Sequence, residues 1–152
     1  LNSTVIGPYD APKTRLPGAG GATEIAAHAR QTYVMLKAMP RSLVAQLDFR
    51  TSAGFLEGNG TRASTTMRGT GPQFVITDYG MLKPHPETDE LHLAALFDGV
   101  TVDDARSATG WPLKVAVSVE VIAPPTPIEL ETLRALHART REAHRRPVRL
   151  PA

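Results

Sequence analysis

Hydrophobic residues fall into short runs separated by glycine and proline, and the spacing within each run predicts its secondary structure. Runs rich in β-branched or alternating apolar residues are typical of strands, and they lie at residues 3–6, 32–36, 74–77, 91–97 and 113–122. The alanine-rich segment 23–30 follows a glycine cluster directly and predicts a short helix. The order strand, glycine turn, helix, strand predicts an α/β layer fold with some parallel pairing.

Two further helices are predicted from their terminal residues. Thr101 with Asp104 three positions later is a capping-box pattern, and Gly110 is expected to end that helix as its C′ glycine. Thr126 and Glu129 repeat the pattern before a longer amphipathic helix that runs to about residue 144. The starts of both helices are therefore predicted from hydrogen bonds between residues that are close in the chain.

The remaining segments are less regular. The strands at 74–77 and 91–97 are expected to form an antiparallel pair joined by the turn-like residues 84–89. Residues 43–49 fit either a helix or a strand, and 51–72 form a long connection without periodicity. No repeat or domain boundary is evident, so we expect one domain. A proline pair separates its last helix from the rest of the domain.

Composition excludes several classes of protein. The 152 residues include no cysteine, which excludes disulfides, thiolate zinc sites and cysteine nucleophiles. A net charge of +2 is too small to indicate a nucleic-acid or membrane partner, and no apolar stretch is long enough for a membrane span. We expect a soluble cytoplasmic protein. Its basic excess lies near the end, at Arg134, Arg139, Arg141, Arg145, Arg146 and Arg149.

Few residues suggest enzyme chemistry. The common nucleophile-elbow, phosphate-loop and zinc-helix patterns are absent, and the five histidines lack metal-ligand spacing, so no metal site is expected. Glu57 lies on a glycine-rich loop, and such a loop is more often plain surface than a site. Asp48 and Asp78 each follow an apolar run, where capping a strand end is the simpler role.

The strongest candidate site is the glycine-rich loop at residues 16–22, just before the first predicted helix. It lacks the third glycine of the dinucleotide-binding fingerprint. Glycines before a helix let backbone amides approach a phosphate, a carboxylate or the oxyanion of an acyl transfer. The alternative is a tight turn where a strand and a helix cross closely. The sequence pattern alone leaves both interpretations open.

Six segments together resemble the small (β) subunit of family I coenzyme A transferases, in the glutaconate-like branch that includes 3-oxoadipate CoA-transferases of aromatic degradation. They are NSTVIG at 2–7, PKTRLPGAGGA at 12–22, LDFRTSAG at 47–54, GTGP at 69–72, PET at 86–88 and GVTVDDARSATGW at 99–111.

The resemblance implies an open α/β fold of three layers, with a mixed sheet flanked by helices. It implies a ping-pong reaction in which a glutamate attacks an acyl-CoA thioester and becomes a glutamyl-CoA thioester. Coenzyme A is then a substrate, no cofactor is tightly bound, and an α subunit, an acyl-CoA and a carboxylic acid are the partners. The family role of the loop falls on the backbone amides of Gly20, Gly21 and Ala22, with Gly18 shaping the turn. Ala19 stands where many relatives have glycine, which is harmless if its φ stays negative.

The family's nucleophilic glutamate lies in a Ser-Glu-x-Gly-like segment well upstream of the glycine loop. No glutamate precedes Gly18 here, and Glu24 and Glu57 match no nucleophile pattern. Since the chain opens at Leu1 with strand-like sequence, we expect the C-terminal portion of a β subunit, spanning 1–152, whose nucleophile lies upstream of Leu1 and which is inactive alone. The alternatives are a CoA-thioester hydrolase of the same fold and a non-catalytic truncated paralogue that binds CoA or a partner subunit. Nucleic-acid binding by the arginine-rich end is a further, weaker interpretation, which predicts a steep salt dependence.

Overall fold

A computed structural model describes residues 1–145 and divides the chain into two compact units, 1–122 and the segment from Ala123 onward. The second unit contains helix α3 (Pro127–Arg145). The Thr126 amide donates to the Glu129 carboxylate at 2.7 Å and the Glu129 amide donates to the Thr126 hydroxyl at 3.4 Å, which confirms the predicted capping box. Across residues 1–145, no helix is both long and apolar enough to cross a membrane.

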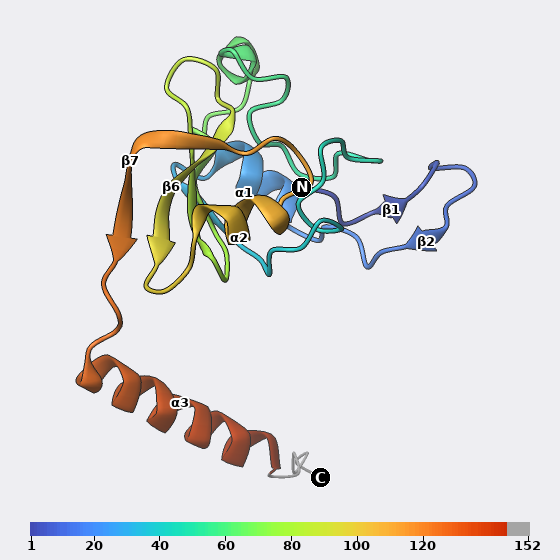
Figure 1. Cartoon of the computed structure of the whole chain (residues 1–152). Helices are drawn as coiled ribbons and strands as arrows, with labels where there is room; N and C mark the ends of the chain where they lie inside the picture. The colour runs from blue at the N-terminus through green and yellow to red at the C-terminus, as the bar shows by residue number, and fades with distance from the viewer. Residues whose placement is uncertain (146–152) are drawn as a thin grey trace, which may run out of the picture. The chain divides into compact units, whose positions relative to one another are not determined.

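The first unit is built on a mixed five-stranded sheet (Figure 1), and a mixed sheet is what the family resemblance implies. The strands lie in chain order, and they are β3 (Thr32–Met35), β4 (Pro72–Ile76), β5 (Gly80–Pro84), β6 (Leu91–Phe97) and β7 (Lys114–Ile122). The outer pairs β3–β4 and β6–β7 are parallel, whereas β5 is antiparallel to both of its neighbours. The expectation of some parallel pairing is confirmed.

Short elements surround this sheet. Helices α1 (Ala22–His28) and α2 (Val102–Ser107) confirm two predictions. The first predicted strand is shorter than expected: β1 (Val5–Ile6) pairs only with β2 (Thr14–Arg15), in a separate two-stranded sheet. The long connection 51–72 contains a single 3₁₀ turn, η1 (Thr61–Ser64).

The predicted direct pairing of strands 74–77 and 91–97 is wrong, because β5 lies between them and pairs with each. The sequence of β5, GMLKP, contains no β-branched residue and ends in proline, so its strand propensity is low. Burial overrides propensity here: Leu82 is completely buried in the core. At the β4–β5 turn, the Thr77 amide donates to the Gly80 carbonyl at 2.8 Å.

The hydrophobic core lies between the sheet and α2, which crosses one face of the sheet in Figure 1. Leu82 of β5 and Leu93 of β6 are completely buried, and Ala105 is the buried residue of α2. Burying each leucine side chain contributes roughly 1.5–3 kcal/mol. The core is thus centred on the antiparallel strands rather than on the N-terminal elements.

Strand β7 bends sharply along its length, as Figure 1 shows. Its register against β6 shifts from Leu93 opposite Val115 to Ala95 opposite Glu120, so three extra residues of β7 bulge out of the ladder. Val117 lies in the bulge and is fully exposed.

Helix α2 begins with the predicted capping box but ends earlier than predicted. Its C-cap is Ala108, so the expectation that Gly110 is the C′ glycine is wrong. The Gly110 amide instead donates to the Leu43 carbonyl at 2.7 Å, and a side chain at 110 would collide with that carbonyl. Gly110 also pairs with Val44 in an isolated bridge, and this bridge is the only regular structure in the ambiguous segment 43–49.

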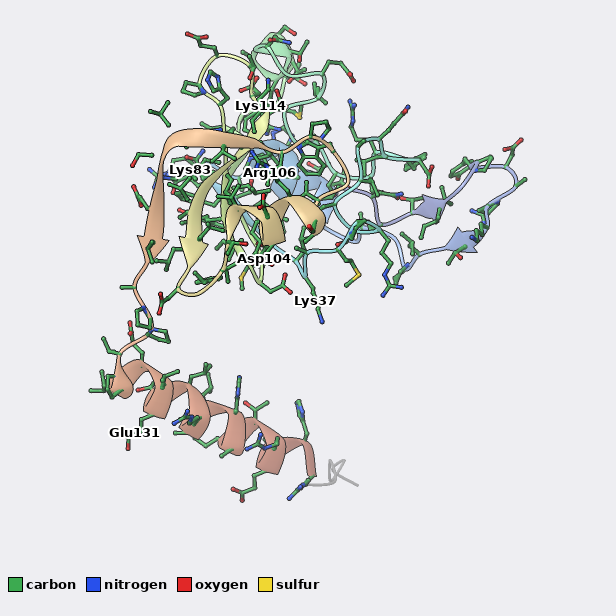
Figure 2. All side chains as sticks on the ribbon, in the orientation of Figure 1. Lys37, Lys83, Asp104, Arg106, Lys114 and Glu131 are labelled. Carbon is green, nitrogen blue, oxygen red and sulfur yellow. The ribbon has the colours of Figure 1, made fainter. Side chains whose placement is uncertain are left out.

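The hydrogen bonds that cap α2 also change the pKa of Asp104. The Asp104 carboxylate, labelled in Figure 2, accepts from the Thr101 hydroxyl at 2.6 Å and from the Thr101 amide at 2.9 Å. These hydrogen bonds lower the pKa of Asp104 below its ordinary value. Their stabilising effect is therefore complete above the ordinary carboxyl pKa, and it is lost as the pH falls through the lowered pKa.

Replacing Thr101 with alanine is expected to lower the free energy of unfolding by about 1 kcal/mol at neutral pH, because α2 loses its N-cap. The difference from the wild type should shrink in acid, once Asp104 is protonated in both proteins. Urea unfolding at a series of pH values measures this difference in the free energy of unfolding. Ser107→Ala, on the exposed end of the same helix, is the control. A difference that grows as the pH falls would contradict this account of the cap.

Candidate active site at the glycine-rich loop

The glycine-rich loop joins β2 to α1 and is held by backbone hydrogen bonds to residues 3 and 4, just before β1. The Leu16 amide donates to the Thr4 carbonyl at 2.9 Å, and the Gly18 amide donates to the Ser3 carbonyl at 2.8 Å. Gly18 and Gly20 have φ values of +89° and +52°, which strain any residue with a side chain. These two glycines are required by the turn itself.

Three backbone amides of the loop have no partner within the described residues, those of Ala19, Gly20 and Gly21, and the last two are adjacent glycines. The Gly18 amide is used within the chain, and the Ala22 amide donates to the Ala19 carbonyl at 3.0 Å. Within residues 1–145, the N–H groups of Gly20 and Gly21 donate to no other group. Two adjacent amides at an exposed turn are suited to binding one oxygen atom that carries negative charge.

Gly21 distinguishes the two interpretations of the loop. Its φ is −76°, which any residue adopts, and a Cβ atom built on it would meet nothing within 4 Å. The same open space surrounds Gly18 and Gly20, so the loop is not a place where strand and helix backbones cross closely. No contact within the described chain therefore accounts for a glycine at position 21, which is the N-cap of α1. Ala19 is not among the residues with positive φ, so its methyl group adds no strain.

The carboxylates singled out in the sequence have local partners. Asp48 accepts from the Gly7 amide at 3.0 Å and Asp78 accepts from the Ala38 amide at 2.8 Å, so each carboxylate binds an amide of another segment instead of capping the run that it follows. Glu57 forms an ion pair with Arg50 at 2.7 Å, and Glu24 lies 3.7 Å from His28 on the surface of α1. Within residues 1–145, no three histidine or acidic side chains are grouped closely enough to hold a metal ion.

A large, mainly apolar cavity of about 1010 Å³ lies in the first unit, and Ala22 at the end of the glycine loop is one of its lining residues. Part of its rim is backbone in an unusual conformation. Leu56, Asn59 and Asp89 all have φ between 50° and 60°, and all three line the cavity. The Asn59 amide donates to the Thr88 carbonyl at 3.1 Å, which joins the two rim loops. No sequence pattern indicates this cavity, because its lining comes from segments far apart in the chain.

A buried arginine organises the long connection next to the site. Arg62 of η1 is only 5% exposed and has four backbone acceptors at 2.7–2.9 Å. Two of them, Ala26 and Ala27, lie near the C-terminal end of α1, and the others, Gly54 and Gly69, lie in the 51–72 connection. Burial lowers the pKa of Arg62, which stays protonated at neutral pH. Sequence reasoning missed this residue, since a cation bound by main-chain carbonyls has no acidic partner to reveal it.

Comparison with characterised proteins gives a consistent result. The chain is 44% identical over 144 residues to the B subunit of 3-oxoadipate CoA-transferase from Pseudomonas knackmussii, covering 95% of this chain and 55% of that protein. It is 39% identical over 125 residues to the B subunit of glutaconate CoA-transferase from Acidaminococcus fermentans, covering 82% of this chain and 47% of the relative. The chain thus spans about half the length of the relatives that it matches.

The fold agrees with a solved structure. The crystal structure of glutaconate coenzyme A-transferase from Acidaminococcus fermentans superposes with a TM-score of 0.80 and 35% identity, covering 88% of this chain and 51% of that one. The sequence model of the family described as Coenzyme A transferase matches residues 1–107, which include the glycine loop, Arg62 and the sheet through β6. This chain belongs to the coenzyme A transferase family.

Proposed function

We propose that this chain is part of the B subunit of a CoA-transferase that moves CoA between succinyl-CoA and a dicarboxylic or 3-oxo acid such as 3-oxoadipate. Its similarity to the B subunits of two CoA-transferases supports the reaction class. Because those relatives are about twice as long as the matched region, the complete activity needs residues beyond these 152. An α subunit completes the proposed enzyme.

In the proposed reaction, a glutamate supplied from outside these residues attacks the thioester carbonyl. A C–O bond forms, the C–S bond breaks, and CoA leaves as its thiolate, which gives an acyl-glutamyl anhydride. The thiolate then attacks the glutamyl carbonyl and releases the first acid, so CoA is held as a glutamyl thioester. The second acid displaces CoA by the same two steps in reverse.

The glycine loop is assigned the stabilisation of charge in these steps. Each attack places negative charge on a carbonyl oxygen, and the free amides of Gly20 and Gly21 are suited to donating to it. The observation that carries this assignment is the open space around Gly21, where neither φ nor packing explains the absence of a side chain. Gly18 fixes the turn, and Ala22 continues the loop into α1.

The activity is tested with the assembled enzyme, containing this chain within its complete subunit together with the α subunit. With succinyl-CoA and 3-oxoadipate we expect stoichiometric succinate and 3-oxoadipyl-CoA, and parallel double-reciprocal plots that indicate ping-pong kinetics. Without an acceptor acid, no steady release of free CoA thiol is expected. Thiol release at the same rate with and without acceptor would identify a hydrolase, and transfer to no dicarboxylic acid would overturn the proposal.

A further inference from the structure

Helix α1 is held in the first unit by polar contacts rather than by buried side chains. None of its seven residues is buried, and its one large apolar side chain, Ile25, is 61% exposed. The carbonyls of Ala26 and Ala27 accept from the buried Arg62 guanidinium at 2.8 and 2.9 Å. Carbonyls in the last turn of a helix have no partner within the helix, so a donor from elsewhere both satisfies them and fixes the helix. Arg62 therefore anchors α1.

The same guanidinium joins α1 to two points of the 51–72 connection. It donates to the Gly54 carbonyl at 2.7 Å and to the Gly69 carbonyl at 2.8 Å. The Gly69 amide in turn donates to the Ala27 carbonyl at 3.0 Å, so the connection also contacts the helix directly. Arginine suits this position because its planar fork of donors has a fixed geometry and points in several directions at once.

The other side of the glycine loop is tied to the same connection. The Gly18 amide donates to the Ser3 carbonyl at 2.8 Å, and the Ser3 amide donates to the Thr51 hydroxyl oxygen at 2.9 Å. Thr51 lies three residues before Gly54, whose carbonyl binds Arg62. One segment thus holds the loop on both sides, through Ser3 before the loop and through α1 after it.

The free amides of the loop lie at the start of the helix that Arg62 anchors. Gly21 is the N-cap of α1, and its carbonyl accepts from the Ile25 amide at 3.1 Å. From Gly21 to the carbonyls that bind Arg62 is roughly 8 Å along the helix axis. Because a helix this short transmits a displacement as a rigid body, a shift at its C-terminal end moves the Gly21 amide. A misplacement of about 1 Å at a reacting group can lower a rate by about 100-fold.

We propose that Arg62 is a positioning residue of the transferase, which fixes through α1 the direction in which the Gly20 and Gly21 amides point at the developing oxyanion. The inference rests on the proposed function of the glycine loop. Arg62 acts through the helix, because its side chain is buried and each of its four hydrogen bonds ends on a main-chain carbonyl.

The test compares Arg62→Lys with the wild type in the assembled enzyme. Lysine keeps the positive charge but lacks the planar fork, so it cannot donate to all four carbonyls at once. We expect kcat per competent site to fall about 10-fold, while KM for succinyl-CoA and for 3-oxoadipate stays within about twofold. Competent sites are counted by intact mass spectrometry, as the fraction of subunits that gain CoA covalently from succinyl-CoA. Unfolded protein therefore does not lower the measured kcat.

Arg50→Met is the matched control. It removes an arginine from the same part of the chain but breaks only the surface ion pair with Glu57. Its kcat per competent site should stay within about twofold of the wild type. A fall in kcat equal to that of Arg62→Lys would contradict a specific role for the buried guanidinium.

A double-mutant cycle with Gly21→Pro separates positioning from general stability. In the proline background, one of the amides that Arg62 positions is already missing. Arg62→Lys should then lower kcat by at most about threefold, instead of about 10-fold. Equal losses in the two backgrounds would mean that Arg62 acts independently of the Gly21 amide, and would overturn the proposal.

Hydrogen exchange tests the structural step without turnover. In the assembled protein, Arg62→Lys is expected to speed exchange at least about fivefold at the Ile25 and Ala29 amides, which donate within α1, and to leave residues 91–97 of β6 unchanged. Unchanged exchange in α1, or a kcat per competent site like that of the wild type, would also overturn the proposal. If the wild type itself transfers no CoA, the proposed function fails, whereas exchange in α1 still decides whether Arg62 holds the loop in place.

Discussion

Replacing Arg62 with methionine is expected to lower the free energy of unfolding by about 3–5 kcal/mol. The guanidinium is buried and donates to the carbonyls of Gly54, Gly69, Ala26 and Ala27. Methionine fills a similar volume but donates nothing, so the acceptors lose charge-assisted hydrogen bonds while the side-chain packing is largely kept. The cation also lies at the negative end of the α1 dipole, and that interaction is lost as well.

Equilibrium urea unfolding, followed by the fluorescence of Trp111, measures the effect of the Arg62 substitution. Trp111 is the only tryptophan, and it packs against the core cluster. The matched control is Arg50→Met, which removes an arginine from the same part of the chain but breaks only a surface ion pair with Glu57. Its cost should stay within about 1 kcal/mol. Equal losses in the two variants would contradict a special role for the buried guanidinium.

Replacing Gly21 with proline is expected to lower kcat of the assembled transferase about 100-fold, with little change in the free energy of unfolding. The φ of −76° is close to the value that proline imposes and a Cβ atom there would meet nothing within 4 Å, so position 21 itself accepts proline and loses its N–H group. That N–H has no partner in the described chain, so the fold loses no hydrogen bond. Losing one oxyanion donor typically costs about 100-fold to 1,000-fold in kcat.

Gly21→Ala separates the lost donor from the added bulk. Alanine keeps the N–H group and places a methyl group in the open space beside the loop. If the donor acts in the transition state, the alanine variant should be at least about 10-fold more active than the proline variant, with the difference mainly in kcat. Steady-state kinetics on both variants provide the comparison. Equal kcat values would assign the effect to bulk and remove the amide from the mechanism.

Local chemistry made the helix starts predictable. The capping boxes at Thr101 and Thr126 are each formed within four residues, so the sequence contains every group involved. The end of α2 was mispredicted because Gly110 is required by the Leu43 carbonyl, a neighbour distant in the chain. From the sequence alone, a glycine near a helix end can either end the helix as its C′ residue or leave room for a backbone group distant in the chain.

Features that depend on tertiary contacts were not visible in the sequence. Strand β5 forms because Leu82 is buried between β4 and β6, although its own residues are poor strand formers. Arg62 gave no signal, since its partners are backbone carbonyls that any residue could supply. The position of the glycine loop was evident from its composition, but which of its amides are free depends on the Ser3 and Ala19 carbonyls.

The order of strands in the sheet has a consequence for the folding pathway. Strands β4, β5 and β6 are joined by short turns, whereas β3 pairs with β4 only after the chain of residues 36–71 has closed. Closing a long loop costs entropy before any contact compensates for it, so the antiparallel strands form first and β3 joins late. Helix α1 and the glycine loop directly precede β3 in the chain, so we expect them to become ordered together with it. We therefore expect the part of the unit that carries the proposed chemistry to become ordered after the antiparallel strands and to open before them.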